Sequence, residues 1–438
     1  MRIVHITAGA GGRLCGSCLH DNALVQSLVR RGCDAVLLPA YVPTTTDTLN
    51  VSESRVVMGG INIWLQEKIP FFRYTPWFID RLLDSPRLLL WLSSHTGNME
   101  AADLGPLTES SLLGEHGHQK KEIQKLCFLL TNEIQPDVVH LSNALLLGMA
   151  HPIRKTTNVP IVCSLSGEDI FIEKIPEPWY SRIRELLRKQ ARSADRFVAM
   201  NMFFADFMAD YLAVPRNLIE VIPHGIDPNV FPQTPPDICK RIQEKKALGK
   251  PVVIGALARA CPEKGLHLLI EALPMVRKKI NADIHAAGAV IESEKEYIDT
   301  CLQTACTEGV ADHFTWLGQL DHAAKHSFFR SIDLFVMPTV FPEAKGIPVI
   351  EAMASGVPVV APNHGAFPEM LHDEHNGRLH KPGDVHDLAR VLIETLECTQ
   401  RSRELGINGH AFVQQRHLAD QMAEQHELLY DRVISTHI

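Results

Sequence analysis

The sequence predicts an α/β protein made of two doubly wound parallel-sheet domains. Two observations support this prediction. Short apolar runs alternate with amphipathic segments of helical length from the N-terminus, and the same alternation starts again after a linker over residues 229–249. The chain has 438 residues, which suits two to three domains of roughly 100–200 residues each.

The first domain is expected to open with a strand, a glycine-rich turn, a helix and a second strand. Residues 2–7 form an apolar strand, residues 9–16 the turn, and residues 18–31 a helix that Gly32 ends. A crossover of this length joins parallel strands, so residues 35–39 are expected to lie parallel to the first strand. Further strands are predicted at residues 136–141, 159–165, 196–200 and 218–222.

An insertion over about residues 62–125 interrupts this alternation. It holds three of the five Trp residues, at positions 64, 77 and 91, with arginines interleaved among them. The run is open to two interpretations: a platform for an acceptor or a membrane surface, or a layer packed over the first sheet. The leucines among the aromatic residues favour packing.

A second α/β set follows the linker. Its strands are predicted at residues 251–257, 283–287, 313–317, 333–338 and 357–361, with a helix over 264–279 and helical structure from about 386 onward. The expected boundaries are 1–225 for the first domain, 226–415 for the second and 416–438 for a terminal helix.

Composition excludes several classes of protein. The 43 Lys and Arg against 51 Asp and Glu give a net charge of −8, which argues against a nucleic-acid binder. The ten Cys are scattered singly, mostly in apolar runs, which favours a reducing compartment. No leader-like or membrane-spanning apolar run is visible, so a cytoplasmic protein is expected, with peripheral contact at the inner membrane face left open.

The most informative segment is residues 338–361. Glu343 and Glu351 are separated by seven residues, with Gly346 and Ile347 between them at the expected start of a helix. A loop of this kind offers backbone N–H groups to an anion. Glu351 could accept hydrogen bonds from vicinal hydroxyls such as those of a ribose, and Glu343 from sugar hydroxyls. The alternative is a pair of solvated carboxylates near a helix start, which the helix dipole also favours.

Residues 343–360 resemble the carboxylate signature of family 4 retaining glycosyltransferases, which have the GT-B fold of two Rossmann-like domains facing across a cleft. The match departs at Lys345, where an aromatic residue is common. Residues 256–265 resemble the Gly-Arg-x4-Lys-Gly segment of the same family, which implies that Arg259 and Lys264 hold the donor diphosphate. Fixed cations stabilise the charge that develops on this leaving group.

The resemblance extends to three further segments and spans about residues 1–60 and 125–430. Residues 221–227 resemble the family's turn at the domain junction, residues 9–16 the loop after its first strand, and residues 365–369 a segment near the donor. The first domain then takes the acceptor side, the second binds the nucleotide sugar, and the terminal helix packs back on the first domain. The donor-binding residues implied are Arg259, Lys264, Glu351, Gly346, Ile347, Gly12 in the first glycine-rich loop, and Glu369.

The first domain departs from the family where polar contacts to the sugar are expected. Ser166 stands where many relatives have a His, and His140 matches the first His of a common His-x-His pair whose second position is Ser142. The resemblance therefore implies Glu343 and His140 as catalytic residues. The residues expected on the acceptor or sugar side are Ser166, Glu168, Asp169 and Asn143.

The activity implied is a metal-independent, retaining transfer of a sugar from a nucleotide-diphosphate donor to an acceptor hydroxyl. No cofactor and no metal are expected, since the chain has no Asp-x-Asp motif and Cys15-x-x-Cys18 has no second pair at zinc-site spacing. Two alternatives remain: a nucleotide-sugar epimerase on the same fold, and a non-catalytic nucleotide-sugar-binding module. The acceptor is a carbohydrate, a lipid-linked molecule or another hydroxyl compound. The sequence identifies neither the donor base, the sugar, the acceptor nor the oligomeric state.

Overall fold

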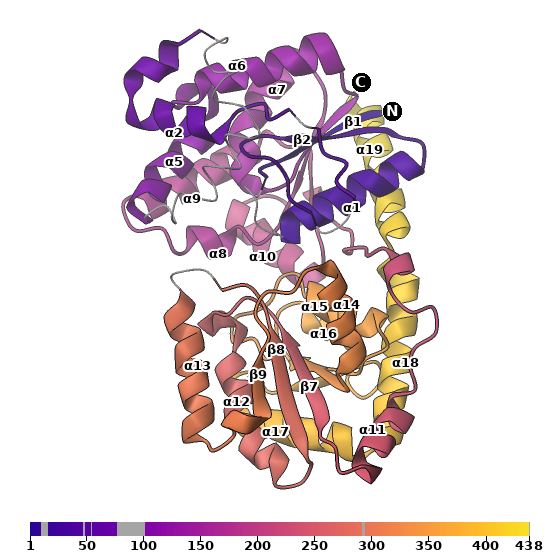
Figure 1. Ribbon diagram of the computed structural model, residues 1–438. Coiled ribbons are helices and arrows are strands. Elements are labelled where there is room, and N and C mark those ends of the chain that lie inside the picture. The colour runs from indigo at the N-terminus through magenta and orange to yellow at the C-terminus, as the bar shows by residue number, and fades with distance from the viewer. Residues whose placement is uncertain (10–15, 47–48, 54, 77–100, 291–293, 438) are drawn as a thin grey trace. The chain divides into compact units, whose positions relative to one another are not determined.

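The structure is a computed structural model of the chain, and it describes residues 1–9, 16–46, 49–53, 55–76, 101–290 and 294–437 (Figure 1). Two compact units make up the chain. Unit 1 consists of Met1–Gly225 and Ala419–Ile438, and unit 2 consists of Ile226–Leu418. The chain therefore enters unit 2 after Gly225 and returns to unit 1 at Ala419, where its last helix begins.

Unit 1 is built on a six-stranded parallel sheet in the order β2-β1-β3-β4-β5-β6. Its strands are Arg2–Thr7 (β1), Asp34–Pro39 (β2), Val138–Leu141 (β3), Ile161–Ser164 (β4), Arg196–Ala199 (β5) and Ile219–Val221 (β6). Most of these residues are buried aliphatic side chains, because helices cover both faces of such a sheet. Each strand predicted for this half of the chain is present, which confirms that part of the fold prediction.

Helices and short helical turns surround this sheet. The α-helices are α1 (Gly16–Arg30), α2 (Gly60–Lys68), α5 (Ala101–Leu113), α6 (Lys120–Leu129), α7 (Ala150–Thr157), α8 (Asp169–Ile172), α9 (Trp179–Ala191), α10 (Met202–Leu212) and α19 (Ala419–His437). Shorter turns are η1 (Pro70–Tyr74), η2 (Gly114–His116), η4 (Ala144–Met149) and η5 (Arg216–Leu218), with a π-helical turn η3 at Leu130–Ile134.

The last helix belongs to the core of unit 1. Helix α19 runs beside α1 (Figure 1), and Arg31 Nε donates to Glu427 Oε2 at 2.9 Å next to this contact. Met422 and Tyr430 of α19 are buried in one apolar cluster with Ile3 of β1. A segment from the end of the chain thus completes the hydrophobic core around its first strand.

The insertion is only partly packed. In α2, Asn62 and Gln66 are buried, and Gln66 Nε2 donates to Glu122 Oε1 of α6 at 2.8 Å. The aromatic side chains behave differently: Trp64 is 43% exposed, Phe71 70% and Tyr74 85%. The packing interpretation therefore fails for these three side chains, while the aromatic residues between positions 77 and 91 lie outside the described residues.

Unit 2 contains a second six-stranded parallel sheet in the order β12-β11-β10-β7-β8-β9. Its strands are Val252–Leu257 (β7), Ala282–Ala287 (β8), Phe314–Trp316 (β9), Leu334–Val336 (β10), Val359–Pro362 (β11) and Arg378–His380 (β12). The strand β12 was not predicted. Its sequence, Arg-Leu-His, carries no β-branched residue and no apolar alternation, so its strand conformation depends on pairing with β11.

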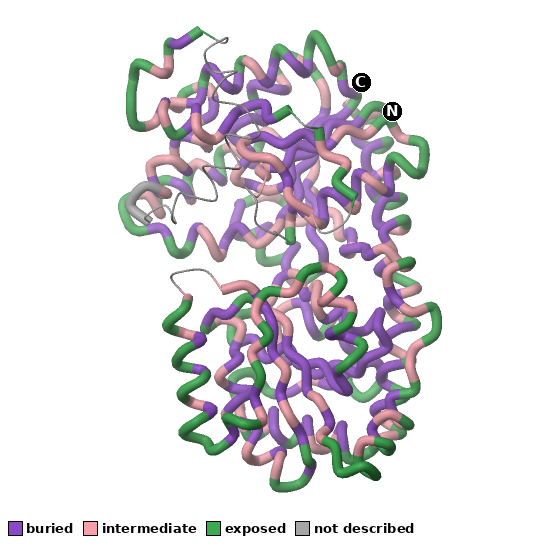
Figure 2. Tube along the Cα trace, in the orientation of Figure 1, coloured by how far each residue is buried: buried purple, intermediate pink, exposed green. Residues whose placement is uncertain are grey.

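Two apolar clusters pack on the faces of this sheet. One includes Ile254, Leu269 and Val336, and the other includes Phe335, Val349 and Phe367. Figure 2 shows the central strands as buried and the outer helix faces as exposed. The α-helices are α11 (Ile238–Ala247), α12 (Leu266–Arg277), α13 (Lys295–Thr307), α14 (His322–Ser331), α15 (Ile347–Ala354), α16 (Phe367–Met370), α17 (Val385–Glu397) and α18 (Thr399–Arg416). The 3-10 turns are η6 (Pro228–Val230), η7 (Pro262–Lys264) and η9 (Ala311–His313).

The strand orders locate the crevices of the two sheets. In unit 2 the order reverses between β7 and β10, and in unit 1 between β1 and β3. Ligands of doubly wound sheets bind at such switch points, outside the carboxyl ends of the strands. Within the part of the chain that the structure describes, no helix is long and apolar enough to cross a membrane.

Candidate functional site

Two glycines shape the loops that follow β10 and β11. Gly346 caps the N-terminus of α15 at φ +61°, and a Cβ there would lie 2.9 Å from Met370 Sδ. Gly365 also has φ +61°, and a Cβ there would lie 2.6 Å from the backbone N and O of Glu343. Both positions therefore favour glycine. The close approach lets Ala366 N–H donate to the Glu343 carbonyl at 2.8 Å, which joins the two loops.

The loop after β7 reaches the same place. Gly265 has φ +69°, and a Cβ there would lie 1.9 Å from the carbonyl oxygen of Pro338. Lys264 forms a largely buried ion pair with the carboxylate of Glu343, 79 residues further along the chain. Burial opposes ionisation of Glu343, but Lys264 and, to a lesser extent, Lys345 outweigh it and hold the pKa of the carboxyl below its usual value.

Arg259 lies just beyond β7 and is partly open to solvent. Its Nε is 3.3 Å from Glu294 Oε1, and its Nη2 is 3.8 Å from Cys261 Sγ. Burial, opposed by the neighbouring guanidinium, raises the pKa of the Cys261 thiol, so this sulfur stays a neutral neighbour. With 42% of its side chain exposed, the guanidinium remains accessible to an anion.

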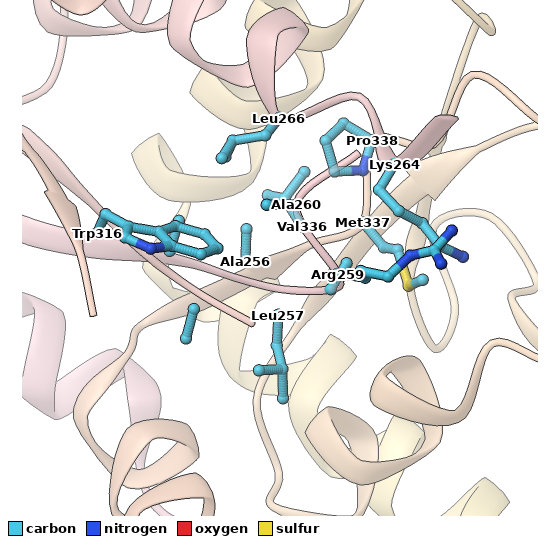
Figure 3. Close-up of a pocket in the computed structure, with 13 residues that line it drawn as sticks. Ala256, Leu257, Arg259, Ala260, Lys264, Leu266, Trp316, Val336, Met337 and Pro338 are labelled. Atoms are coloured by element: carbon cyan, nitrogen blue, oxygen red, sulfur yellow. The ribbon is translucent and has the colours of Figure 1, made fainter. Parts of the chain in front are cut away.

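Arg259 and Lys264 border a small pocket at the carboxyl ends of β7, β8, β9 and β10. The pocket encloses about 330 Å³ including its mouth. In Figure 3 the indole of Trp316 stands at one end, and Arg259 and Lys264 stand at the other. The pocket therefore combines an apolar wall with two cations beside the switch point of the unit 2 sheet. Its lining residues are Ala256, Leu257, Ala258, Arg259, Ala260, Lys264, Leu266, Ala286, Ala287, Trp316, Val336, Met337 and Pro338.

Glu351 lies in the second turn of α15 and is 8% exposed. Its Oε1 accepts a hydrogen bond from Lys325 Nζ of α14 at 2.6 Å. This pairing was not foreseen, because Lys325 lies on a helix whose polar residues alone predict a solvated face. The second expected carboxylate is therefore held by a cation of its own, separate from the Lys264–Glu343 pair.

Two further residues expected at the donor, Ile347 and Glu369, belong to the segments of unit 2 that join Glu343 to its neighbouring loop. Ile347 is the first residue of α15, directly after Gly346. Glu369 lies in α16, and its N–H donates to Ala366 at 3.2 Å, next to the contact with the Glu343 loop. Gly12 lies outside the described residues.

His140 does not occupy the position expected of a catalytic residue. It is fully buried at the end of β3, where Nδ1 lies 2.6 Å from Tyr430 Oη and Nε2 lies 2.8 Å from Ser164 Oγ. Burial and neighbouring histidines lower the pKa of its ring well below the usual value. Both ring nitrogens are engaged inside the core, a geometry that does not support the expected catalytic role of His140, and that role stays a prediction.

The acceptor-side residues do gather in unit 1, after β3 and β4. The Glu168 carboxylate accepts from Ala144 N–H at 2.9 Å and from Ser166 N–H at 2.6 Å, so it ties the two loops together. Asn143 Oδ1 accepts from Leu145 N–H and caps η4. These bonds give both side chains a role in shaping the loops.

Asp169 differs from its neighbours in this group. Its side chain is buried, and its Oδ1 has no hydrogen-bond partner. Burial, with the charge of Glu168, raises the pKa of this carboxyl to about 6. An acid of this kind can exchange a proton near neutral pH.

The described residues contain no cluster of three or more His, Cys, Asp or Glu side chains that could hold a metal ion. The residues that sequence reasoning missed are the partners of the expected ones. Glu294 pairs with Arg259, and Lys325 pairs with Glu351. Neither has a local sequence signal, because each is paired only through the tertiary fold.

Two family models match the chain, one over the strands of the unit 2 sheet and the other over strands β3 to β6 of unit 1. The model described as "Glycosyl transferases group 1" covers residues 239–412, and "Glycosyltransferase Family 4" covers residues 111–230. The chain is a family 4 glycosyltransferase. The first model contains Arg259, Lys264, Glu343 and Glu351, so the charged residues of the unit 2 site lie within the region that defines the family.

Curated relatives of this glycosyltransferase include several mannosyltransferases. A GDP-mannose-dependent alpha-(1-6)-phosphatidylinositol monomannoside mannosyltransferase of Mycolicibacterium smegmatis is 27% identical over 287 residues, covering 64% of this chain and 72% of that protein. The MMP alpha-(1->4)-mannosyltransferase of Mycolicibacterium hassiacum is 24% identical over 311 residues, covering 68% of this chain and 71% of that protein.

Solved structures of GT-B glycosyltransferases share the fold over the whole chain. Anabaena HepE, solved with UDP and glucose, has a TM-score of 0.67 at 19% identity, covering 99% of this chain and 100% of that one. Sucrose-phosphate synthase of Thermosynechococcus elongatus has a TM-score of 0.71 at 15% identity, with full coverage of both chains. The family 4 enzyme therefore has the predicted GT-B fold.

Proposed function

We propose that this family 4 enzyme transfers a sugar from a nucleotide-diphosphate donor to an acceptor hydroxyl, without a metal ion and with retention of the anomeric configuration. The observation that carries the proposal is the charged group on unit 2. Arg259 and Lys264 border a pocket at the switch point of the sheet, and Lys264 contacts the first signature carboxylate, Glu343. A site of this kind supplies cations for a diphosphate and acceptors for hydroxyls.

Each side chain has a chemical role in this proposal. Arg259 and Lys264 bind the diphosphate and stabilise the charge that it gains as it leaves. Glu351 accepts hydrogen bonds from the ribose hydroxyls, and Glu343 accepts them from the sugar. The first turn of α15, with Gly346 and Ile347, adds backbone N–H groups and the positive end of the helix dipole.

The transfer step needs no reactant other than the donor and the acceptor. The bond between the sugar C1 and the diphosphate oxygen breaks, and a bond between C1 and the acceptor oxygen forms on the same face. The acceptor proton passes to the departing phosphate oxygen. Two protein cations take the place of a divalent ion in neutralising the leaving group, which supports activity in the presence of a chelator.

The relatives support a narrower proposal for the substrates. Several of them are named as GDP-mannose-dependent enzymes that act on phosphatidylinositol mannosides. We therefore assign GDP-mannose as the donor and a lipid-linked polyol as the acceptor. Asp169, with its pKa of about 6, lies among the acceptor-side residues of unit 1 and is suited to contact an acceptor hydroxyl.

The aromatic face of the insertion fits a lipid-linked acceptor. Phe71 and Tyr74 are among the most exposed aromatic residues described, and Arg73 lies between them. Exposed aromatic side chains favour the interfacial region of a bilayer, whereas the half-buried Arg73 guanidinium donates to the carbonyls of Gln66 and Glu67. We expect the enzyme to sediment with anionic vesicles and the Phe71→Ser/Tyr74→Ser variant to sediment less. Equal sedimentation of both would contradict a membrane contact at this face.

Titration of GDP, UDP and ADP by calorimetry in EDTA tests the donor site. We expect one nucleotide to bind in the micromolar range and the Arg259→Ala/Lys264→Ala variant to lose at least about tenfold in affinity, since each charge-assisted contact contributes about 1.5–3 kcal/mol. Lys240→Ala/Arg403→Ala is a charge-matched control, because these two side chains form only weak surface pairs at 3.9 and 3.7 Å.

The outcomes separate the alternatives. Absence of nucleotide binding, or equal binding by the Arg259→Ala/Lys264→Ala variant, would exclude the donor site. Binding without release of nucleoside diphosphate from any nucleotide sugar would favour a non-catalytic binding module. Conversion of the donor sugar without an acceptor product would favour an epimerase.

A further inference from the structure

Three carboxylates of the unit 2 site are each paired with a different cation. Lys264 pairs with Glu343, Arg259 with Glu294, and Lys325 with Glu351. The first two pairs involve residues to which the proposed function already gives a role. Lys325 has no such role, and it contacts the carboxylate that the proposal assigns to the ribose.

The Lys325–Glu351 pair is short and shielded. Nζ lies 2.6 Å from Oε1, and the side chains are only 17% and 10% exposed. The two residues belong to different helices, α14 and α15, and are 26 positions apart in the chain. Water screens such a pair less than one on the surface, and removal of one partner leaves an uncompensated, partly buried charge.

Helix α14 is itself fixed in place, so Lys325 extends from a rigid support. Phe328 and Phe329 of this helix are buried in the apolar core of unit 2. On the side facing the linker, the ring of His326 packs edge-on against Phe231 at 5.1 Å between centroids. The lysine stem therefore starts from a defined position, and its ammonium group constrains the Glu351 carboxylate.

We propose that Lys325 is a positioning residue that orients Glu351 for the ribose of the nucleotide donor. This inference rests on the proposed function. Through Oε1, Lys325 fixes the rotation of the carboxylate, so that its oxygens are held in place to accept hydrogen bonds from a vicinal diol. Preorganised acceptors of this kind strengthen hydrogen bonds to the ligand, because the ligand does not have to order them. Lys325 acts through Glu351 and makes no contact with the substrate.

The inference predicts a change in how the enzyme distinguishes ribose from deoxyribose. Calorimetry measures the affinity of each variant for the nucleoside diphosphate that the wild type binds. It also measures the affinity for the 2′-deoxy and 3′-deoxy forms of that nucleotide. We expect the wild type and the Lys325→Arg variant to prefer the ribonucleotide by about tenfold, the range for one charge-assisted hydrogen bond. In the Lys325→Met variant, which keeps the length of the stem, the preference falls to about twofold or less.

Two further variants make the test specific. Arg330→Met removes another cation from α14, one whose guanidinium donates to the Ser327 hydroxyl at 3.4 Å. We expect this variant to keep the full preference for the ribonucleotide. Glu351→Gln loses the preference to the same degree as Lys325→Met. If Lys325→Met does not fold, Lys325→Gln takes its place, because its amide can still donate a hydrogen bond to Glu351 but carries no charge. We expect Lys325→Gln to lose at least half of the preference for the ribonucleotide.

The outcomes distinguish the inference from the function on which it rests. A wild type that binds no nucleotide contradicts the proposed function. A wild type that binds ribo- and deoxynucleotides equally contradicts the role of Glu351 and with it that of Lys325. If Glu351→Gln loses the preference while the folded Lys325→Met variant keeps it, Glu351 binds the ribose unaided and the inference about Lys325 is wrong.

Discussion

At the scale of single residues, the carboxylates of Glu343 and Glu351 in the proposed donor site are each paired with a cation. Lys264 contacts Glu343, so a diphosphate that binds Lys264 competes with a carboxylate already in place. In the proposed function, a diphosphate that takes over Lys264 would release Glu343 to accept hydrogen bonds from the sugar, so we expect binding of one half of the donor to prepare the site for the other half.

This competition predicts opposite effects of one substitution. In Glu343→Gln the competing charge is gone, so we expect the nucleoside diphosphate to bind about three- to tenfold more tightly, the range of about 1 kcal/mol for a weakened ion pair. The same variant should lose at least about 100-fold in turnover, because the sugar loses its charged acceptor. Calorimetry and a diphosphate-release assay measure the two effects.

Glu351→Gln is the matched control for this experiment. It removes the same charge from a carboxylate that does not contact Lys264, and we expect it to weaken binding of the nucleoside diphosphate. Weaker binding by both variants would contradict the exchange of partners on Lys264.

At this scale the sequence predicts candidate residues only where spacing carries information. Two short motifs predict Glu343, Glu351, Arg259 and Lys264 as site residues, and the structure places Lys264 and Glu343 in contact, while their function stays a prediction. For His140, position at a strand end does not reveal that a helix from the far end of the chain covers the ring, so its burial could not be predicted. Lys325 could not be identified, since its partner lies in another helix.

At the scale of elements, most strands could be predicted and the short one at Arg378–His380 could not. Apolar runs such as residues 2–7 and 251–257 predict buried parallel strands directly, because both sheet faces are covered. The strand β12 is set by its neighbour β11 rather than by its own residues. The same reason limits the prediction for the insertion, where exposure of Phe71 and Tyr74 is a tertiary property.

A second element-scale feature is a buried group of histidines where β1, β3, α1 and α19 meet. His5 and His140 have ring centroids 4.5 Å apart, His140 and His426 are 5.6 Å apart, and His20 Nδ1 lies 2.7 Å from His224 Nδ1. Burial, reinforced by neighbouring histidines, lowers the pKa of His20 and His140 well below 6.5, and burial lowers that of His426 to about 4. The rings of His20, His140 and His426 are therefore neutral in the folded protein at neutral pH.

This group predicts a loss of stability in mild acid. The unfolded chain binds protons at His426 below about pH 6.5 and the folded chain only near pH 4, so stability is complete above pH 6.5 and falls between these values. Each such histidine contributes up to about 1.4 kcal/mol per pH unit. The urea midpoint of the wild type should fall steeply between pH 7.5 and pH 4.5. It should fall less steeply in His426→Gln, while a variant of the exposed His151, the control, should behave like the wild type. Midpoints that stay constant between pH 6.5 and 4.5 would contradict neutral burial.

At the scale of the whole molecule, the chain forms two units and passes between them twice, after Gly225 and before Ala419. Unit 2 carries the paired charges and the pocket, while unit 1 carries Ser166, Glu168, Asp169 and Asn143. The fold class and the approximate limits of each sheet followed from the alternation of strands and helices. The acceptor could not be predicted in this way, because the loops after the strands and the insertion follow no shared pattern of residues.

The central claim is that the cations of unit 2 drive transfer from a nucleotide sugar without a metal ion. It is tested most directly by release of nucleoside diphosphate from GDP-mannose in EDTA, with and without vesicles that contain phosphatidylinositol. We predict release that the vesicles stimulate and that falls at least about 100-fold in Arg259→Ala/Lys264→Ala, the loss expected for two charged contacts to the leaving group. Equal release by the wild type and this variant would contradict the account.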